Sequence, residues 1–191
     1  PEHPRPQFQR AHWLNLNGEW AFRIDNGDSG RQALWHEDPS ALTQKITVPF
    51  CPESALSGLA HTDFMPAVWY QRPLDIPPTW SGQRVHLHFG AVDYECHAWV
   101  NGQPVGRHYG GSSSFHFDIT DALQTNDNQL VVLARDDSRS GLQPNGKQSK
   151  ELHSHGCHYT RTTGIWQTVW LEAVPTSHID SVRVVADLDG E

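Results

Sequence analysis

Residues 96–108 read CHAWVNGQPVGRH and predict two β-strands joined by a tight turn. The Asn101-Gly102 pair lies between two short stretches that carry strand-forming side chains. Asn-Gly tolerates the two positive φ angles that a type I′ turn requires, and such turns match the twist of paired strands. This stretch therefore predicts a β-hairpin with strands at residues 96–100 and 103–108.

Short strand-like stretches that end at turn residues recur along the whole chain. Residues 84–89, RVHLHF, alternate polar and apolar side chains and end at Gly90. Helical spacing is nearly absent, and one short helical turn is expected at residues 121–124. Further strands are expected at residues 19–24, 45–48, 67–74, 115–118, 129–135 and 168–173. About nine strands of this kind predict an all-β fold, an antiparallel two-sheet β-sandwich of the jelly-roll type.

The composition agrees with a sandwich that has a large aromatic core. Charged residues make up 19% of the chain, below the globular average of roughly a quarter, while 8 Trp and 13 His are unusually many. Aromatic side chains also stack on sugars, but most of these Trp residues are expected in the core.

The charge pattern excludes two classes of partner. The net charge is −8 and no run of Lys or Arg occurs, which argues against binding of nucleic acid or of an anionic membrane surface. No apolar stretch approaches the roughly 20 residues of a membrane span, and no signal-peptide pattern opens the sequence. Three widely spaced cysteines, Cys51, Cys96 and Cys157, form no disulfide framework. A cytoplasmic location is therefore expected.

Two segments depart from the strand pattern. Residues 138–154 are polar, contain Gly and Pro, and predict a long loop of the kind that often has a function. Residues 176–191 begin with a polar turn, and alternation restarts at residue 179. We expect residues 1–175 to form one domain and residues 176–191 to be a linker and the first strand of a following domain.

Several motifs, taken in order, resemble one known family. They are LNGEWAF (16–22), VPFCPES (48–54), WYQR (69–72), LHFGAVDY (87–94), WVNG (99–102), GG (110–111), FHFDIT (115–120) and YTRTTGIWQTVWLE (159–172). Together they resemble the N-terminal sugar-binding domain of family-2 glycoside hydrolases, the β-galactosidase/β-glucuronidase group. The last motif is the most specific. The resemblance implies a galactose-binding-domain-like jelly roll, followed by an immunoglobulin-like domain and a catalytic (β/α)₈ barrel.

The resemblance also implies a function. It suggests an accessory domain of a β-galactosidase-like β-glycosidase of carbohydrate metabolism, which hydrolyses O-glycosidic bonds and whose parent enzyme is a homo-oligomer. The catalytic glutamates of such enzymes belong to the barrel, so we expect no catalytic residue in this chain and no activity from it alone. The acidic residues of this chain fit turns or exposed strand positions instead: Glu53, Asp63, Glu95, Asp118 and Asp136-Asp137.

Four residues are expected at the rim of the sugar pocket. Asp93 occupies a position where some relatives have an Asn that reaches the sugar, although a turn-capping role accounts for it equally well. His158 aligns with an Asp that touches the sugar or its sodium ion in relatives. Because an imidazole is a poor sodium ligand, we carry over neither sodium nor magnesium and expect no cofactor. Cys157 and Tyr159 complete the predicted rim.

Two alternative functions remain open from the sequence. The same fold serves as an autonomous carbohydrate-binding module, which would bind sugar through an exposed aromatic platform. The other alternative is a metal site, since His153 and His155 would face one side of a strand, with Cys157 and His158 nearby. In that case His97, His108 and His116 could lie close in space. The spacing matches no standard structural zinc site.

Overall fold

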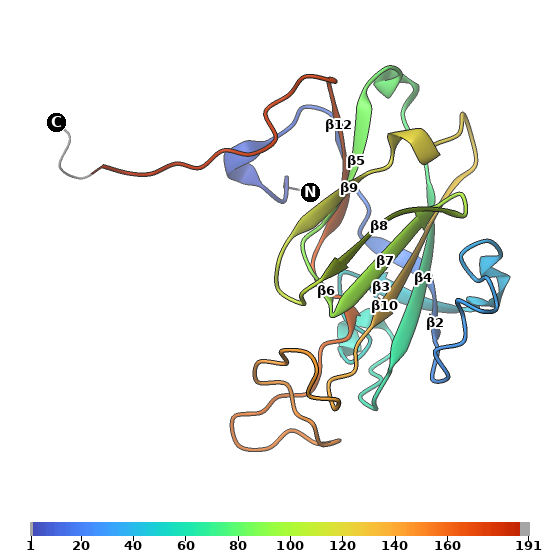
Figure 1. Ribbon diagram of the computed structural model, residues 1–191, viewed down its shortest axis with the longest axis vertical. Coiled ribbons are helices and arrows are strands. Elements are labelled where there is room, and N and C mark those ends of the chain that lie inside the picture. Colours follow the sequence, from blue (N-terminus) through green and yellow to red (C-terminus); the bar gives the residue numbers. More distant parts are fainter. Residues whose placement is uncertain (1, 188–191) are drawn as a thin grey trace.

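The computed structural model describes residues 2–187, whose antiparallel strands form two packed sheets (Figure 1). One sheet has the strand order β1 (Trp13–Asn15), β12 (Val169–Val174), β5 (Arg84–Phe89) and β9 (Phe115–Asp118). The other has the order β3 (Gln44–Val48), β2 (Gly18–Ile24), β4 (Ala67–Leu74), β10 (Asn128–Arg135), β7 (Glu95–Val100) and β8 (Gln103–Tyr109). A short ladder joins β6 (Val92–Asp93) to β11 (Gly164–Ile165). The predicted all-β sandwich is confirmed.

Alternation along each strand places the core between the sheets. In β2, Trp20 and Phe22 are buried while Glu19 and Arg23 are exposed, which is the two-residue period of a strand with one solvent face. The Trp20 indole N–H donates to the Leu16 carbonyl at 2.7 Å, so the buried ring leaves no unsatisfied donor.

The hairpin that the sequence predicts at Asn101-Gly102 is confirmed. Both residues have positive φ, +53° for Asn101 and +76° for Gly102. The Asn101 side chain donates to the Ala122 carbonyl and accepts a hydrogen bond from the Gln129 N–H. It therefore ties the turn to β10 and to the 3₁₀ turn Thr120–Ala122, which stands where the short helical turn was expected.

Three strands of the structure were not predicted from the sequence. β1, β6 and β11 are two or three residues long, too short for a period of two residues to be visible. The nine expected strands are all present, with ends that differ by at most one residue.

Most Trp residues are core residues, as the composition predicts. Trp69 and Trp99 stack with ring centroids 5.7 Å apart on the outer face of the six-stranded sheet. Residues 25–43 cover this face, where Trp35 packs edge-on against Trp69. These rings are therefore not available to a sugar.

The outer face of the four-stranded sheet is covered by the N-terminal arm, and Glu172 of β12 holds that arm. Its carboxylate lies 3.3 Å from His3 Nε2 and 3.4 Å from Arg10 Nε, and accepts the Trp170 indole N–H at 2.8 Å. Burial opposes ionisation of Glu172, but hydrogen bonds from His88 and Trp170 outweigh it and lower the pKa to about 2.

Replacing Glu172 with Gln is expected to lower the free energy of unfolding by about 2 kcal/mol at pH 7, because a buried charged acceptor is lost. A carboxylate with a lowered pKa contributes stability above its unfolded value of 4.5, and this is lost as the pH falls towards 2. E172Q is expected to lose that part of the pH dependence in urea titrations. E19Q, which removes an exposed pair with Lys45, is the control and should change stability by less than about 1 kcal/mol. Equal effects of both substitutions would contradict the role of Glu172.

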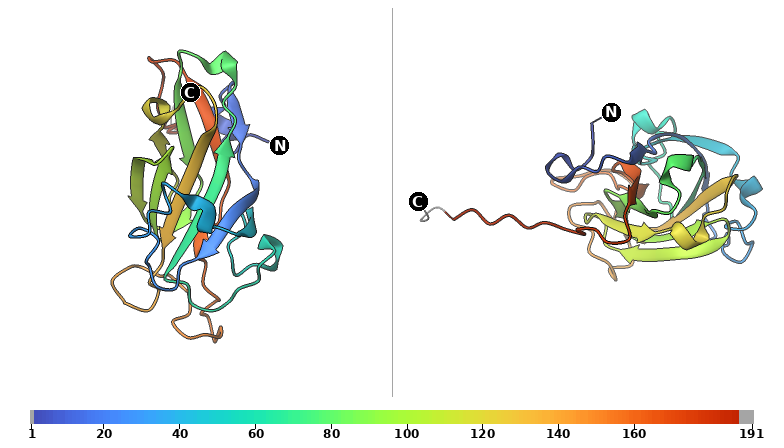
Figure 2. Two further views of the ribbon diagram at one scale, coloured as in Figure 1. Left: turned by 90° about the vertical axis from the view of Figure 1, so that its right-hand side faces the viewer. Right: turned by 90° about the horizontal axis from the view of Figure 1, so that it is seen from above.

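The C-terminal tail runs away from the sandwich (Figures 1 and 2). Residues 176–187 contain no strand, so the strand expected from residue 179 is not formed in the described part of the tail. The apolar side chains of Ile179, Val182 and Val184 are exposed. The division at residue 175 and the start of a further domain stay predictions, and residues 188–191 lie outside the described residues. Between residues 2 and 187, no helix is long and apolar enough to cross a membrane.

Candidate functional site

The short ladder between β6 and β11 brings the two motifs expected at the sugar rim together. Gly164 pairs with Asp93, and Ile165 pairs with Val92. Gly164 has φ +75°, and a Cβ atom at this position would lie 2.2 Å from the Tyr70 hydroxyl oxygen. The Ile165 N–H donates to that same oxygen at 3.2 Å. Gly164 and Ile165, from the longest motif, therefore bring the backbone into direct contact with Tyr70 of the core.

Asp93 is a buried carboxylate, not a turn cap. Gln148 Nε2 donates to its Oδ2 at 2.7 Å, while Oδ1 has no hydrogen-bond partner among the described residues. The backbone of Gly111 packs on the carboxyl group so closely that a Cβ there would lie 2.4 Å from it. Asp93 is only 6% exposed, so its carboxylate is closed to a ligand in this structure.

Two further buried carboxylates lie near Asp93. Burial raises the pKa of Asp93, the charges of Asp136 and Glu53 raise it further, and the value reaches about 7 despite the hydrogen bond from Gln148. Burial likewise raises the pKa of Asp136 and that of Glu53. Glu53 lies in a turn, as expected, but its carboxylate is buried. The interpretation of Asp136 was wrong, because it lies neither in a turn nor at an exposed strand position. Both carboxylates accept hydrogen bonds from Thr163 in the interior.

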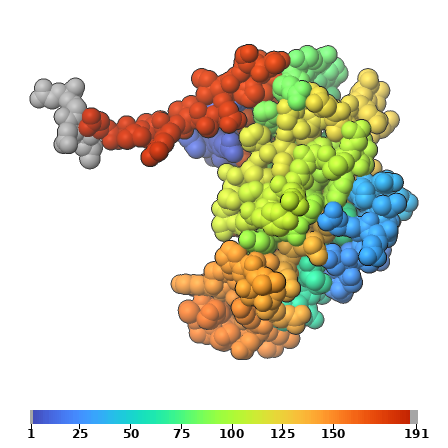
Figure 3. Space-filling view, viewed as in Figure 1, coloured from blue at the N-terminus to red at the C-terminus, as the bar shows by residue number. Residues whose placement is uncertain are grey.

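Residues 136–163 form a lobe below the sandwich (Figure 3, orange). As the sequence predicts for residues 138–154, the segment has no strand, and side chains hold it instead. Gln148 is central, because its amide donates to Asp93 and accepts the Thr162 N–H at 2.7 Å. Tyr159 lies beside it, since the backbone of Tyr159 bonds to Lys147 and Ser149. Gln148 thus joins two predicted rim residues, Asp93 and Tyr159.

Arg161 holds the base of the same lobe and was not recognised from the sequence. Its guanidinium is buried and donates to the carbonyls of Ser149, Glu151 and Leu152 within the loop, and to that of Thr62 outside it. Its carbon centre also lies 4.1 Å from the centroid of the Phe64 ring. The sequence signal for this role is a single Arg after a long polar segment, and a solvated surface arginine gives the same signal.

The predicted rim residues Cys157, His158 and Tyr159 are exposed at the tip of the lobe. His155 and His158 exchange backbone hydrogen bonds across a turn at Gly156, and their rings stack 5.1 Å apart. The expectation that His153 and His155 alternate on a strand was wrong, because Gly156 takes φ +52° and the chain turns back there. Between residues 2 and 187, no three His, Cys, Asp or Glu side chains are arranged to hold a metal ion.

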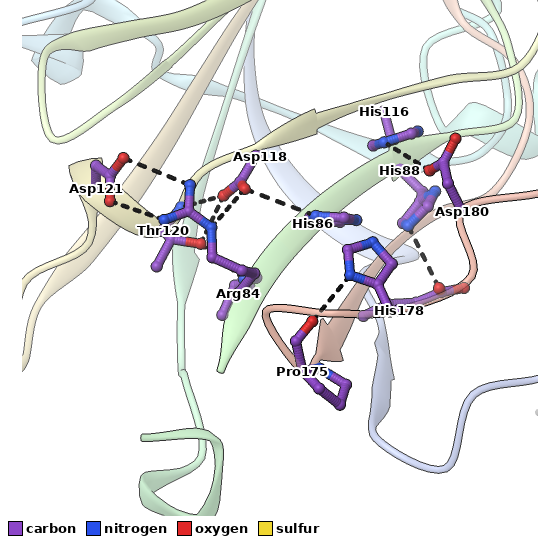
Figure 4. A network of polar contacts seen from close by, with 12 residues as sticks. Arg84, His86, His88, His116, Asp118, Thr120, Asp121, Pro175, His178 and Asp180 are labelled. Carbon is purple, nitrogen blue, oxygen red and sulfur yellow. Dashed lines mark hydrogen bonds and ion pairs between the residues drawn. The ribbon is translucent and has the colours of Figure 1, made fainter. Parts of the chain in front are cut away.

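The histidines that do gather in space lie elsewhere, on the outer face of the four-stranded sheet (Figure 4). The His86 and His116 rings stack with centroids 4.9 Å apart. The His88 ring lies 5.0 Å from that of His116, and the His178 ring lies 5.2 Å from that of His86. Burial, followed by the charge of His116, lowers the pKa of His86 to about 4. His97 and His108 have other partners, Glu95 and Ser113. The expected gathering of His97, His108 and His116 around the rim is not observed.

Comparisons of the sequence and of the fold with known proteins point to one family of glycoside hydrolases. The family described as "Glycosyl hydrolases family 2, sugar binding domain" matches residues 14–175. A β-glucuronidase of Paenibacillus borealis is 27% identical over 93% of this chain and 32% of its own length. A β-galactosidase of Thermoanaerobacter pseudethanolicus is 30% identical over 65% of this chain and 16% of its own. The solved β-glucuronidase of an uncultured Clostridium sp. superposes with TM-score 0.72 at 25% identity, over 95% of this chain and 33% of that one.

Proposed function

Because the chain belongs to the sugar-binding domain family of the family 2 glycosyl hydrolases, we propose that it is the N-terminal accessory domain of a β-glycosidase. The parent enzyme hydrolyses O-glycosidic bonds. The chain spans about a third of the length of the β-glucuronidase relatives that it matches, which leaves room for an immunoglobulin-like domain and a catalytic barrel. We also propose that the parent enzyme is a homo-oligomer.

The substrate class we propose is a β-glucuronide. The names of the relatives support this choice, since the reported curated and solved proteins that match over nine-tenths of this chain are β-glucuronidases. A β-galactosidase matches over a shorter stretch, so the β-galactosidase-like specificity expected from the motifs has weaker support.

The contacts that run from Asp93 through Gln148 to Tyr159 are the observation that supports the proposed role of this chain at the sugar site. Gln148 fixes the base of the segment that presents Cys157, His158 and Tyr159 to solvent. These exposed groups can donate to and accept from sugar hydroxyls, as a rim contribution requires. The chain positions this segment and contributes no acid, base or nucleophile.

The chain alone is expected not to hydrolyse nitrophenyl β-glucuronide or nitrophenyl β-galactoside. A catalytic carboxylate pair must flank the bond that it cleaves, whereas Asp93, Glu53 and Asp136 are each more than nine-tenths buried. Release of nitrophenol measures this directly. Turnover that survives repurification would overturn the accessory role.

In the complete enzyme, His158→Ala and Tyr159→Ala are expected to raise KM for the glycoside by about tenfold, because each removes a contact that the bound sugar makes at the rim. Lys150→Ala, an exposed substitution in the same loop, is the matched control and should leave KM unchanged. If both rim variants behave like the control, the proposed rim is wrong.

A further inference from the structure

A cleft lies beside Tyr94, the residue that follows Asp93 in the chain. It has a volume of about 370 Å³, and its lining includes Tyr94, Glu95, Tyr109, Arg135, Asp137 and Leu142. This volume falls within the usual range for small-ligand pockets, roughly 300–1,000 Å³. The cleft uses none of Cys157, His158 or Tyr159.

Two tyrosine rings form the apolar part of the cleft. Tyr94 and Tyr109 meet edge to face, with centroids 6.5 Å apart and planes at 61°. Tyr109 is 49% exposed, so a large part of it is open to solvent, unlike the tryptophan rings of the core. A ring that combines an apolar face with a polar tip suits a pyranose, which has a face of C–H groups and an edge of hydroxyls.

The polar groups of the cleft are held in place by one another. Glu95 accepts the Tyr109 hydroxyl at 3.1 Å through Oε1, and Arg135 Nη1 donates to Oε2 at 3.4 Å. His97 Nε2 lies 2.5 Å from Glu95 Oε1, and Arg135 also pairs with Asp28. Such a fixed set of donors and acceptors is what orients a ligand in a pocket.

Two polar groups of the lining remain available to a ligand. Neither the Tyr94 hydroxyl nor the Asp137 carboxylate has a hydrogen-bond partner in the part of the chain that the structure describes. Asp137 is exposed, and its backbone is fixed by Gln143, which in turn donates to buried Asp136. The lining of the cleft therefore offers a ligand one carboxylate acceptor and one phenolic hydroxyl.

The charge of the lining selects among sugars. Asp28, Glu95 and Asp137 contribute three negative charges and Arg135 one positive charge, which leaves the lining at −2. Burial opposes ionisation of Glu95, but hydrogen bonds from His97 and Tyr109 lower its pKa. A carboxylate on the sugar would be repelled here, whereas a neutral pyranose would not.

We propose that this cleft binds a neutral pyranose ring, which stacks on Tyr109 and hydrogen-bonds to Tyr94 and Asp137. The site is formed within this chain alone, so it goes beyond the accessory role and does not depend on the rim residues. A single ring of this size is expected to bind with a dissociation constant on the order of 1 mM.

An NMR titration of this chain tests the proposal with methyl β-D-glucopyranoside, methyl β-D-galactopyranoside and methyl β-D-glucuronide. We expect at least one neutral glycoside to bind more tightly than the glucuronide and to shift the amide signals of Tyr94, Tyr109 and Arg135. Tyr109→Ala is expected to weaken binding by about tenfold, while Tyr109→Phe keeps the ring and most of the affinity. Asp137→Ala weakens binding as well, and Leu56→Ala, an exposed substitution outside the cleft, does not.

Three results would overturn the proposal: no binding of either neutral glycoside, tighter binding of the glucuronide, or shifts confined to Cys157, His158 and Tyr159. The last result would place sugar binding at the rim and would support the proposed function instead. A failure of the cleft proposal is therefore distinguishable from a failure of the accessory role, because the accessory role is tested by hydrolysis assays and the cleft by binding.

Discussion

Replacing Gly164 with Ala is expected to lower the free energy of unfolding by about 3 kcal/mol or more. The left-handed backbone at φ +75° costs a non-glycine residue about 1 kcal/mol. The added Cβ would also lie 2.2 Å from the Tyr70 hydroxyl, which is buried and bonded to the Ile165 N–H. Overpacking of this kind costs about 1–3 kcal/mol, and the lost hydrogen bond adds to it. Urea denaturation followed by Trp fluorescence measures the loss.

Gly58 is the matched control for this substitution. It has φ +87°, and no atom lies within 4 Å of a Cβ built on it, so Gly58→Ala should cost only the backbone part, about 1 kcal/mol. If G164A is no more destabilising than G58A, then Tyr70 yields to the added methyl group. The contact between the β6–β11 ladder and the core would then be looser than the structure indicates.

The second large effect concerns the buried carboxylates. Asp93→Asn is expected to raise the free energy of unfolding at pH 8 by roughly 2–4 kcal/mol, because the wild-type carboxylate ionises in the interior. Its folded pKa of about 7 exceeds the unfolded value of 3.8, so its protonated form is favoured on folding. The stability that this group contributes is present below pH 3.8 and is lost as the pH rises through 7.

Urea titrations at pH 4, 6 and 8 measure this difference. The difference in free energy of unfolding between D93N and the wild type should be small at pH 4 and should reach its full size by about pH 8. Asp136 and Glu53 face Asp93 and titrate in the same interior, so some pH dependence remains in D93N. Asp127→Asn, an exposed substitution at the other end of β10 from Asp136, should leave the profile unchanged. A gap that stays constant with pH would show that Asp93 does not titrate in this range.

Most of the fold could be predicted from local sequence. The strand at residues 84–89 alternates polar and apolar side chains and ends at Gly90, and the Asn101-Gly102 turn marks where the two strands of the hairpin meet. β6 and β11 could not be found in this way, because two residues carry no period. They exist because Gly164 allows the chain to pack on Tyr70 beside Asp93, which is a tertiary effect.

The candidate site was less predictable than the fold. Asp93 and Tyr159 were selected through the resemblance, and both lie against Gln148, which no motif indicated. The burial of Glu53 and Asp136 could not be foreseen, since acidic residues beside turns are usually solvated. Their partner is Thr163, more than 25 residues away along the chain from either. Contacts over such separations leave no periodic signal in one sequence.

The way in which Arg161 holds the lobe has a consequence for how such domains diversify. The lobe has no strand pairing, and the Arg161 guanidinium holds it by donating hydrogen bonds to three backbone carbonyls. Every residue type has such a carbonyl, so these bonds do not depend on which side chains the loop carries. Arg161 binds none of the side chains at residues 153–158, which are exposed and contact one another and Ser149. We therefore expect the segment, apart from Gly156 at φ +52°, to accept other residues while the sandwich keeps its structure. Substituting the tip of a relative for residues 153–158 should then transfer recognition without redesign of the scaffold.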